Sequence, residues 1–359
     1  MALTVAYLGC YTEENRRGRG RGLGVFQVDL GSGGWSSIEV LEGERNPSFF
    51  AVERQQRFLY AVHGGTENQV SAFSIDGSTG RLTLLNRESS NGDNPVYPDV
   101  HPTSRWLVVA NYAGATIAAY PLGEDGTIGQ ATDVRTHTGP LGPNSERQDQ
   151  AHPHQVTWDR GGRYLFVPDL GLDRTYVYQL SPEGTFVPND PAFAASAPGS
   201  GPRHIAFHPN GRFAYLIHEM GNTITAFAYD GDRGVIEPLQ TLSTLPSDFS
   251  DVSVASEIAV GPSGRFVYGS NRGHDSIVVF AVDLENGTLS PVEWVSTQGR
   301  IPRHFALDRS GSYLYAENQA SHSVVVFRVD QATGRLTPTG QAIETGSPVC
   351  VAFAQLGEA

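Results

Sequence analysis

One sequence tract recurs six times along this chain, and its spacing constrains the fold more than any other feature. Each copy joins a short hydrophobic run to a polar turn, an aromatic residue and a second hydrophobic run. The copies are residues 47–60, 95–108, 153–166, 202–215, 255–268 and 302–315. They follow one another at about 50 residues with no helical pattern between them, which is typical of the blades of a β-propeller.

Each copy is predicted to hold four strands. In the copy around Arg212, the first strand covers residues 203–208 and the second covers 213–218, with the turn signal Asn210-Gly211 between them. Alternating runs over 223–229 and 236–242 predict the third and fourth strands. The third strand carries an aromatic residue at the same place in every copy, namely Phe73, Tyr120, Tyr178, Phe227, Phe280 and Phe327.

The two ends of the chain are predicted to share a seventh blade. Residues 4–10, 23–30 and 37–41 supply its second, third and fourth strands, and residues 348–353 match the first strand of the repeat. A ring closed in this way leaves no free sheet edge. We therefore predict one all-β domain over residues 1–359, a seven-bladed propeller of four-stranded antiparallel blades.

Because the repeat places equivalent positions in register, the blades can be compared with one another. The comparison concerns the end of the ring where first strands begin and second strands end. There, ionisable residues concentrate on blades three to six, whereas the other blades carry mostly aromatic or small groups. The ionisable residues are His154, Arg203, His204, His218, Glu219, Glu257, Arg272, Arg303 and His304. A one-sided cluster at a channel mouth indicates a binding or catalytic site.

Structural roles compete with this interpretation. One slot holds asparagine in three blades and histidine in two, which favours hydrogen bonding that caps the strands. The residues in that slot are Asn111, Asn271, Asn318, His63 and His218. Buried arginine and glutamate can also satisfy one another as ion pairs. We favour a functional role for four of the ionisable residues. Only blades three and four carry His154 and Arg203 at the same position, and only blades four and five carry Glu219 and Arg272 at another.

Seven short segments resemble, in order and in blade position, the seven-bladed propeller lactonase family. They are residues 152–154, 167–171, 201–204, 218–219, 256–258, 270–273 and 302–305. That family includes the propeller type of bacterial 6-phosphogluconolactonase and the fungal carboxy-muconate cyclase. The resemblance runs nearly from end to end, beginning at Gly9. It implies a lactone hydrolase or the related lactone-forming cyclase.

The resemblance also implies which residues act. It assigns catalytic roles to His154, Arg203, Glu219 and Arg272. Substrate-binding roles fall to His152, His204, Glu257, Asn271, Arg303 and His304. The implied reaction is hydrolysis of a sugar lactone, foremost 6-phosphogluconolactone, with a carboxy-muconate cyclase or another lactonase as alternatives.

Lactone hydrolysis needs a base that takes a proton from water and a donor or cation that stabilises the oxyanion. Glu219 and His154 are both candidates for the base. Arg272 and Arg203 are candidates for the stabiliser. Arginine also suits a phosphate or carboxylate on the substrate, because its planar fork binds two oxygens at once. A small anionic lactone is therefore the expected partner.

No cofactor or metal is required by this chemistry. The alternative is a calcium ion held by Glu219, Asn271 and Asp169, as in other lactonase propellers. Neighbouring Arg203 and Arg272 disfavour it, because they would repel a cation.

The net charge of the chain bears on which other classes of partner it can bind. A net charge of −13 argues against nucleic acid or an anionic membrane. The exception is residues 16–21, where arginine alternates with glycine. This stretch is either an RNA-binding tract or, as we favour, a loop between the second and third strands of blade seven.

The expected location is the cytoplasm. No apolar run is long enough to span a bilayer. The segment Leu8-Gly9-Cys10 faintly resembles a lipoprotein cleavage box but is predicted as part of a strand. Cys10 and Cys350 fall on neighbouring strands of blade seven, where we expect two packed thiols rather than a disulfide.

A propeller that binds a protein partner and catalyses nothing is a second possibility. Such a surface would show aromatic and apolar loops. The long loop over residues 136–150 is instead polar and precedes His152 and His154 directly. We interpret it as a rim over a small-molecule site.

Overall fold

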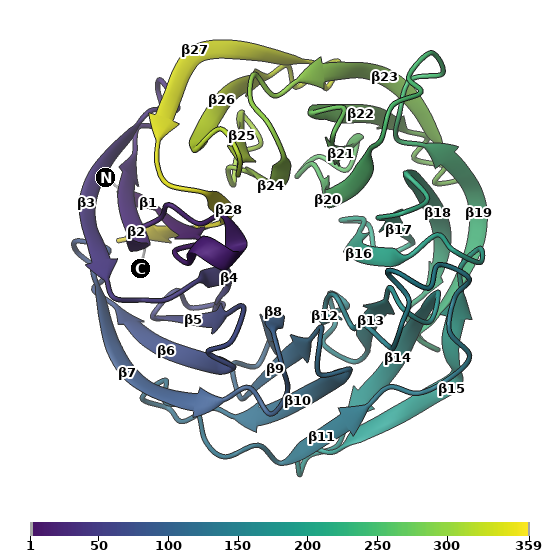
Figure 1. The fold of residues 1–359 in the computed structure, drawn as a ribbon, viewed down its shortest axis with the longest axis horizontal. Coiled ribbons are helices and arrows are strands. Elements are labelled where there is room, and N and C mark those ends of the chain that lie inside the picture. The colour runs from purple at the N-terminus through teal and green to yellow at the C-terminus, as the bar shows by residue number, and fades with distance from the viewer. Residues whose placement is uncertain (1–2, 358–359) are drawn as a thin grey trace.

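The computed structural model describes residues 3–357 and contains seven four-stranded antiparallel sheets arranged as a ring around a central channel (Figure 1). In blades one to six the strands follow chain order from the channel outwards. The predicted seven-bladed all-β propeller is therefore confirmed. No helix within residues 3–357 is long and apolar enough to cross a membrane.

Blades one to three contain the strands between residues 47 and 195. Blade one comprises β4 (Pro47–Val52), β5 (Phe58–His63), β6 (Gln69–Ile75) and β7 (Leu82–Ser89). Blade two comprises β8 (Pro95–Val100), β9 (Trp106–Asn111), β10 (Thr116–Pro121) and β11 (Asp133–Thr136). Blade three comprises β12 (Thr157–Trp158), β13 (Leu165–Asp169), β14 (Arg174–Leu180) and β15 (Phe186–Ala195).

Blades four to six contain the strands between residues 202 and 344. Blade four comprises β16 (Pro202–Phe207), β17 (Phe213–His218), β18 (Thr223–Asp230) and β19 (Val235–Ser243). Blade five comprises β20 (Val254–Val260), β21 (Phe266–Arg272), β22 (Ser276–Val282) and β23 (Leu289–Ser296). Blade six comprises β24 (Pro302–Leu307), β25 (Tyr313–Asn318), β26 (Ser323–Val329) and β27 (Leu336–Glu344).

Blade seven is built from both ends of the chain. Its strands are β28 (Pro348–Leu356), β1 (Leu3–Cys10), β2 (Gly22–Val28) and β3 (Trp35–Glu42), and the short helix η1 (Glu14–Arg16) lies in the β1–β2 loop. β28 pairs antiparallel with β1 from Leu3↔Leu356 to Gly9↔Cys350. The predicted closure of the ring by both termini is confirmed.

The two cysteines do not form a disulfide. Cys350 lies opposite Gly9, whereas Cys10 lies opposite Pro348, so the strand register does not pair the two residues. Both thiols are free and buried. The Cys10 thiol donates to the Gly22 carbonyl at 2.8 Å, and Cys350 packs in the apolar cluster between blades seven and one.

Apolar packing and a repeated tyrosine hydrogen bond join neighbouring blades. Between blades four and five, for example, Tyr215 and Ile217 pack with Val267 and Val278. At six junctions a tyrosine hydroxyl donates to a carbonyl in the outer turn of the next blade. These bonds are Tyr7 to Gly80, Tyr60 to Gly126, Tyr164 to Asp232, Tyr215 to Gly287, Tyr268 to Gly334 and Tyr313 to Gly31.

The turn that receives each tyrosine requires a special backbone. Gly287 has a φ of 78°, in the left-handed region that favours glycine. A Cβ atom added there would lie 2.3 Å from the ring of Phe213, so the turn also packs directly on the neighbouring blade. The glycines of the repeat therefore serve the contacts between blades as well as the turns.

The first strands are irregular where they reach the channel mouth. The pairing register shifts at this point in most blades, for instance between Pro202 and His204 and between Pro302 and His304. A bulge at the rim of a sheet redirects side chains. Blade three goes further, because β12 spans only two residues, and the predicted first-strand residue His154 lies before it. A single bridge between Pro153 and Asp169 holds that segment.

We expect the tyrosine bonds between blades to contribute measurably to stability. Tyr215→Phe removes the donor and leaves the buried Gly287 carbonyl without it, so the free energy of unfolding should fall by about 1–2 kcal/mol. Urea unfolding measures this loss. The matched control is Tyr176→Phe, whose hydroxyl bonds the exposed Thr138 carbonyl, where water can replace it. Equal losses in the two variants would contradict the proposed role of the buried bond.

Candidate active site

The four predicted catalytic residues lie at one end of the channel. Arg203 lies in β16, Glu219 directly follows β17, and Arg272 ends β21. His154 is fixed by its backbone N–H, which donates to the Pro168 carbonyl at 2.9 Å. Arg203 and Glu219 are each 3 % exposed and His154 is 5 % exposed, so the mouth presents buried charge.

Glu219 is the electrostatic centre of this cluster. Its Oε2 accepts from Arg203 Nε at 3.1 Å and from Arg272 Nη2 at 2.9 Å. Its Oε1 accepts from Arg147 Nη2 at 2.5 Å. Burial alone would raise the pKa of Glu219, but Arg272, Arg203 and the other neighbouring cations hold it well below its usual range. Glu219 is therefore an ionised carboxylate whose two oxygens are occupied by arginines.

The two buried arginines also donate hydrogen bonds to backbone carbonyls. Arg203 Nη1 donates to the Ser256 carbonyl at 2.7 Å, and Arg272 Nη2 donates to the Ala255 carbonyl at 2.9 Å. Burial lowers the pKa of the Arg203 guanidinium to about 9, so it stays charged at neutral pH. Arg272 Nε is buried and has no hydrogen-bond partner within residues 3–357. Both guanidiniums are therefore held in place by Glu219 and by a backbone carbonyl.

A chain of three hydrogen bonds and one ion-pair contact connects three histidines and two carboxylates across the channel. His154 Nδ1 lies 3.2 Å from His204 Nε2, and His204 Nδ1 lies 3.0 Å from Glu257 Oε1. Glu257 Oε2 lies 3.5 Å from His304 Nε2, and His304 Nδ1 lies 2.7 Å from Glu317 Oε2. The chain therefore runs His154–His204–Glu257–His304–Glu317. Its first four residues come from four different blades, and Glu317 comes from a second strand of blade six.

The charges along the chain follow from its partners. Burial would lower the pKa of His304, but its two carboxylate neighbours, Glu257 and Glu317, raise it above its ordinary value. Burial would raise the pKa of Glu257, but His204 and His304 lower it to about 2. Burial lowers the pKa of His204 to about 4, and burial together with Arg203 lowers that of His154 well below its usual value. His154 and His204 are therefore neutral at pH 7.

The hydrogen-bond partners of the two neutral histidines indicate which ring nitrogen carries the proton. Ionised Glu257 only accepts, so His204 carries its proton on Nδ1 and leaves Nε2 as an acceptor. Arg203 Nη1 lies 3.2 Å from His204 Nδ1 and 3.3 Å from Nε2, so this donor does not decide the tautomer; the contact with Glu257 does. His154 must then donate from Nδ1 to His204, which leaves His154 Nε2 unprotonated. The chain thus presents one imidazole nitrogen at the mouth as a proton acceptor.

Two predicted substrate-binding residues bond elsewhere. His152 stacks on Tyr112 at 4.1 Å, and its ring nitrogens bond the Tyr112 carbonyl and Asp149. Asn271 donates to the Thr244 carbonyl at 2.8 Å and to Ser276. The structure therefore does not bring His152 or Asn271 into the charged cluster. The capping role that the repeated asparagine favours fits the observed bonds of Asn271.

Arg303 differs from the other arginines at the mouth. Its guanidinium makes no hydrogen bond or ion pair with the described part of the chain. It lies over the Tyr11 ring, with 5.6 Å between the guanidinium carbon and the ring centre. All the donors of Arg303 therefore remain available to a ligand.

Sequence comparison missed three contributors. Arg147 comes from the polar loop predicted as a rim, and only its contact with Glu219 reveals it. Tyr112 lies 3.5 Å from Arg147 and was overlooked among the aromatic residues of blade two. Glu317 is fully buried one residue before the asparagine slot of blade six. In the sequence, the signal for Glu317 is a glutamate within the otherwise mostly apolar second strand of blade six.

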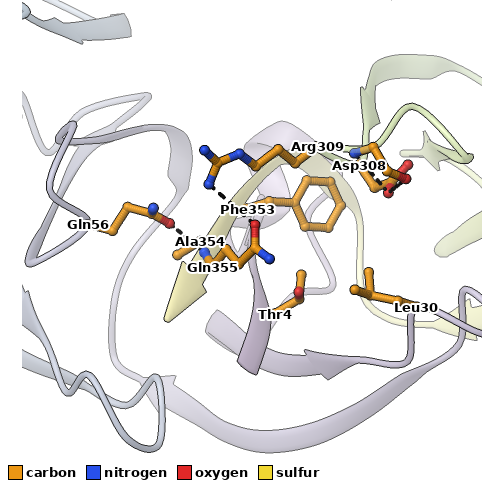
Figure 2. A pocket seen from close by; sticks show the side chains of 9 residues that line it. Thr4, Leu30, Gln56, Asp308, Arg309, Phe353, Ala354 and Gln355 are labelled. Carbon is orange, nitrogen blue, oxygen red and sulfur yellow. Dashed lines mark hydrogen bonds between the residues drawn. The ribbon is translucent and has the colours of Figure 1, made fainter. Parts of the chain in front are cut away.

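The mouth encloses a cavity of about 10 Å³, roughly the size of one water molecule. Its walls include the equivalent first-strand position of six blades, occupied by Ser48, Val96, His154, Arg203, Arg303 and Val349. A larger cavity of about 390 Å³ lies near the opposite end of the ring, between blades six and seven (Figure 2). There Arg309 bonds Gln355, and no part of the charged cluster takes part.

The described residues hold no ready metal centre. No group of three or more His, Cys, Asp or Glu side chains converges as a cation site within residues 3–357. Asp169, one of the calcium candidates, bonds His137 at 2.8 Å and also accepts from the backbone N–H of His152. Glu219 is surrounded by arginines, so these two residues do not offer oxygens to a common ion.

The comparisons with known proteins decide the family. Residues 5–353 match the family model described as "Lactonase, 7-bladed beta-propeller". The chain belongs to this lactonase family. The curated 6-phosphogluconolactonase of Bacillus subtilis is 36 % identical over 309 residues, which cover 86 % of each chain. That of Formosa agariphila is 31 % identical over 312 residues, covering 84 % of this chain and 86 % of its own.

One relative of known structure is named for a different substrate. The Pseudomonas aeruginosa periplasmic gluconolactonase PpgL is 32 % identical, with a TM-score of 0.92 over 99 % of this chain and 100 % of its own. Family membership makes the protein a lactonase, a carboxylic ester hydrolase similar to the 6-phosphogluconolactonases. It also sets aside the interpretation of a propeller that catalyses nothing.

The buried histidines predict a measurable dependence of stability on pH. Burial lowers the pKa of His218 to about 4, whereas an unfolded histidine titrates near 6.5. Between these values the unfolded chain binds a proton that the folded chain does not. The free energy of unfolding must therefore fall as the pH falls through this window.

The test replaces His218 with the residue that occupies the same slot in blade two. In His218→Asn the histidine contribution is absent, so the free energy of unfolding should fall less steeply between pH 6.5 and 4 than in the wild type. Urea unfolding at a series of pH values measures both slopes. Identical slopes would show that His218 is not a buried neutral histidine.

Proposed function

We propose that the protein hydrolyses 6-phosphogluconolactone to 6-phosphogluconate, with His154 as the base. The observation that carries the proposal is the hydrogen-bond chain ending at His154, which leaves an unprotonated imidazole nitrogen beside the water-sized cavity. The names of the two curated relatives support the choice of substrate. The resemblance in sequence and the geometry of the mouth thus support the same reaction.

His154 is a better base than Glu219. The pKa of Glu219 is held well below its usual range and both its oxygens accept from arginines, so it has little tendency to take a proton. Burial and Arg203 lower the pKa of His154 as well, but His154 is neutral at pH 7 and its Nε2, unlike the oxygens of Glu219, makes no hydrogen bond with the described residues. The negative charge of Glu219 also favours the imidazolium that forms when His154 accepts a proton. Glu219 therefore acts by holding Arg203 and Arg272 and by this electrostatic support.

The reaction balances without a cofactor. A water molecule in the mouth cavity attacks the lactone carbonyl while His154 Nε2 takes its proton. Arg303, whose donors are available, stabilises the oxyanion, and the charges of Arg203 and Arg272 add to the positive potential around it. Collapse of the intermediate breaks the ring C–O bond, and His154 returns its proton to the departing oxygen. The product is the open-chain hydroxy acid.

A second candidate is the unphosphorylated sugar lactone. The Pseudomonas relative is named a gluconolactonase, and the chemistry at His154 is the same for both substrates. No observation favours a carboxy-muconate cyclase, which stays an alternative prediction. The cytoplasmic location and the absence of a nucleic-acid or membrane partner also stay predictions.

The central prediction concerns His154. Replacement by Gln preserves size and polarity but removes the proton acceptor, so kcat for 6-phosphogluconolactone should fall by about 10²–10⁴-fold. Spontaneous hydrolysis is subtracted in each assay, and circular dichroism checks the fold. His101→Gln, in the turn between β8 and β9 of blade two, is the matched control and should keep wild-type kcat. A kcat within tenfold of the wild type in His154→Gln would refute the assignment of the base.

A further inference from the structure

A second, larger hollow opens beside the mouth. It encloses about 960 Å³ and lies between the β1–β2 loop of blade seven and the facing turns of blades five and six. Figure 1 shows the purple helical turn of this loop at the inner edge of the ring. The walls also include Gly273, which directly follows Arg272, together with Arg300 and His322. We call this hollow the arginine groove.

The charge of the arginine groove is unusual for this acidic chain. Four arginines, Arg16, Arg17, Arg19 and Arg300, line it together with only two carboxylates, Glu14 and Asp275. Asp275 already has a hydrogen-bond partner, because its Oδ1 accepts from the backbone N–H of Ile301 at 2.8 Å. None of the four guanidiniums forms an ion pair with the described residues.

Several arginines elsewhere on the surface are paired with carboxylates, although others, such as Arg105 and Arg163, form no ion pair with the described residues. Arg81 bonds Glu39 at 2.8 Å, and Arg335 bonds Glu293 at 2.9 Å. Arg21, at the end of the glycine-rich run, pairs with Glu42. The groove thus collects cations without carboxylate partners in a protein with a net charge of −13. Mutual repulsion of like charges is a cost that an anionic ligand would remove.

The loop that carries the first three arginines is held in place. The Ser347 hydroxyl donates to the Arg17 carbonyl at 3.1 Å and accepts from the Arg19 N–H at 3.1 Å. A Cβ atom at Gly20 would lie 2.0 Å from Cys10 Sγ, so glycine lets the backbone pack directly on β1. The alternation of arginine and glycine therefore builds a packed loop that directs guanidiniums outwards, rather than a flexible tract.

Tyr11, which lines the mouth cavity, contacts one arginine of the groove and one of the mouth. The guanidinium carbon of Arg16 lies 5.4 Å from the centre of the Tyr11 ring, and that of Arg303 lies 5.6 Å from the same centre. Arg16 also donates to Asn94 at 2.7 Å, which fixes its position. A ligand with its reactive end beside Arg303 would therefore lie close to Arg16, because both guanidiniums contact the same ring.

We propose that the arginine groove is a subsite for a phosphate monoester, and that it selects phosphorylated over unphosphorylated sugar lactones. The proposal rests on the lactonase function proposed above. A phosphate dianion presents several oxygens that arginine forks bind in pairs, and unpaired guanidiniums supply the donors. Arg203 and Arg272 differ from the groove arginines, because Glu219 already balances their charge as an ion-pair partner.

The test compares two lactones in one variant. Arg17, Arg19 and Arg300 are replaced together by Ala, and kcat/KM is measured for 6-phosphogluconolactone and for gluconolactone. The ratio of the two values, which is the preference for the phosphorylated lactone, should fall by about tenfold or more through a higher KM for that lactone. The matched control replaces Arg81, Arg233 and Arg335, which removes the same charge from the outer turns. An unchanged ratio, or an equal fall in the control, overturns the proposal.

Binding of inorganic phosphate separates this proposal from the proposed function. Calorimetry on the wild-type protein should detect phosphate binding that the groove variant loses and the control keeps. If neither lactone is hydrolysed but this binding pattern holds, the subsite stands and the lactonase reaction falls. If lactones are hydrolysed but phosphate binding is the same in all three proteins, the subsite falls. Salt-sensitive RNA binding lost in the groove variant, without phosphate selectivity, would also overturn it.

Discussion

The pairing of β28 with β1 is the constraint on which the rest of the structure depends. It converts a linear array of blades into a ring, so that every blade packs against two neighbours. Each inner strand then begins at a fixed place around the channel, and side chains more than a hundred residues apart meet there. The contact of Arg303 with Tyr11, between blades six and seven, exists only because the ring is closed. Tyrosine bonds such as Tyr215 to Gly287 keep neighbouring blades in register.

Within this ring, burial decides which group does the chemistry. Three arginines bind Glu219 and suppress its basicity, although a glutamate at a lactonase mouth is at first sight an attractive base. The desolvated His154 stays neutral and is oriented by His204, which in turn is oriented by ionised Glu257. At this end of the ring, Arg303 and the arginine groove carry positive charge that forms no ion pair within residues 3–357. The same side-chain types are therefore structural or reactive according to the partners that the fold provides.

The sequence predicted the architecture well because the repeat contains its own controls. The second strand of blade four was placed at residues 213–218, where β17 lies, and the shared seventh blade was predicted from residues 348–353. The positions of Arg203, Glu219 and Arg272 followed from the same register. Arg147 could not be predicted, because it comes from a long loop outside the repeat. Blade three also departs from the pattern, since its first strand shrinks to Thr157–Trp158.

The histidine chain lay beyond sequence reasoning for a different reason. His204, Glu257 and His304 were each identified as candidates, but their order along one line of hydrogen bonds depends on side-chain directions set by the bulges at the rim. The arginine run at residues 16–21 was correctly placed in the β1–β2 loop. Its relation to Arg300 appears only when blades seven, five and six surround one groove.

The most direct test of the account is a crystal structure of the His154→Gln variant with 6-phosphogluconate bound. The account predicts the carboxylate of the product beside Arg303 and residue 154 at the channel mouth, with the phosphate in the arginine groove. A product molecule bound instead in the cavity near Arg309 at the opposite end of the ring would contradict it.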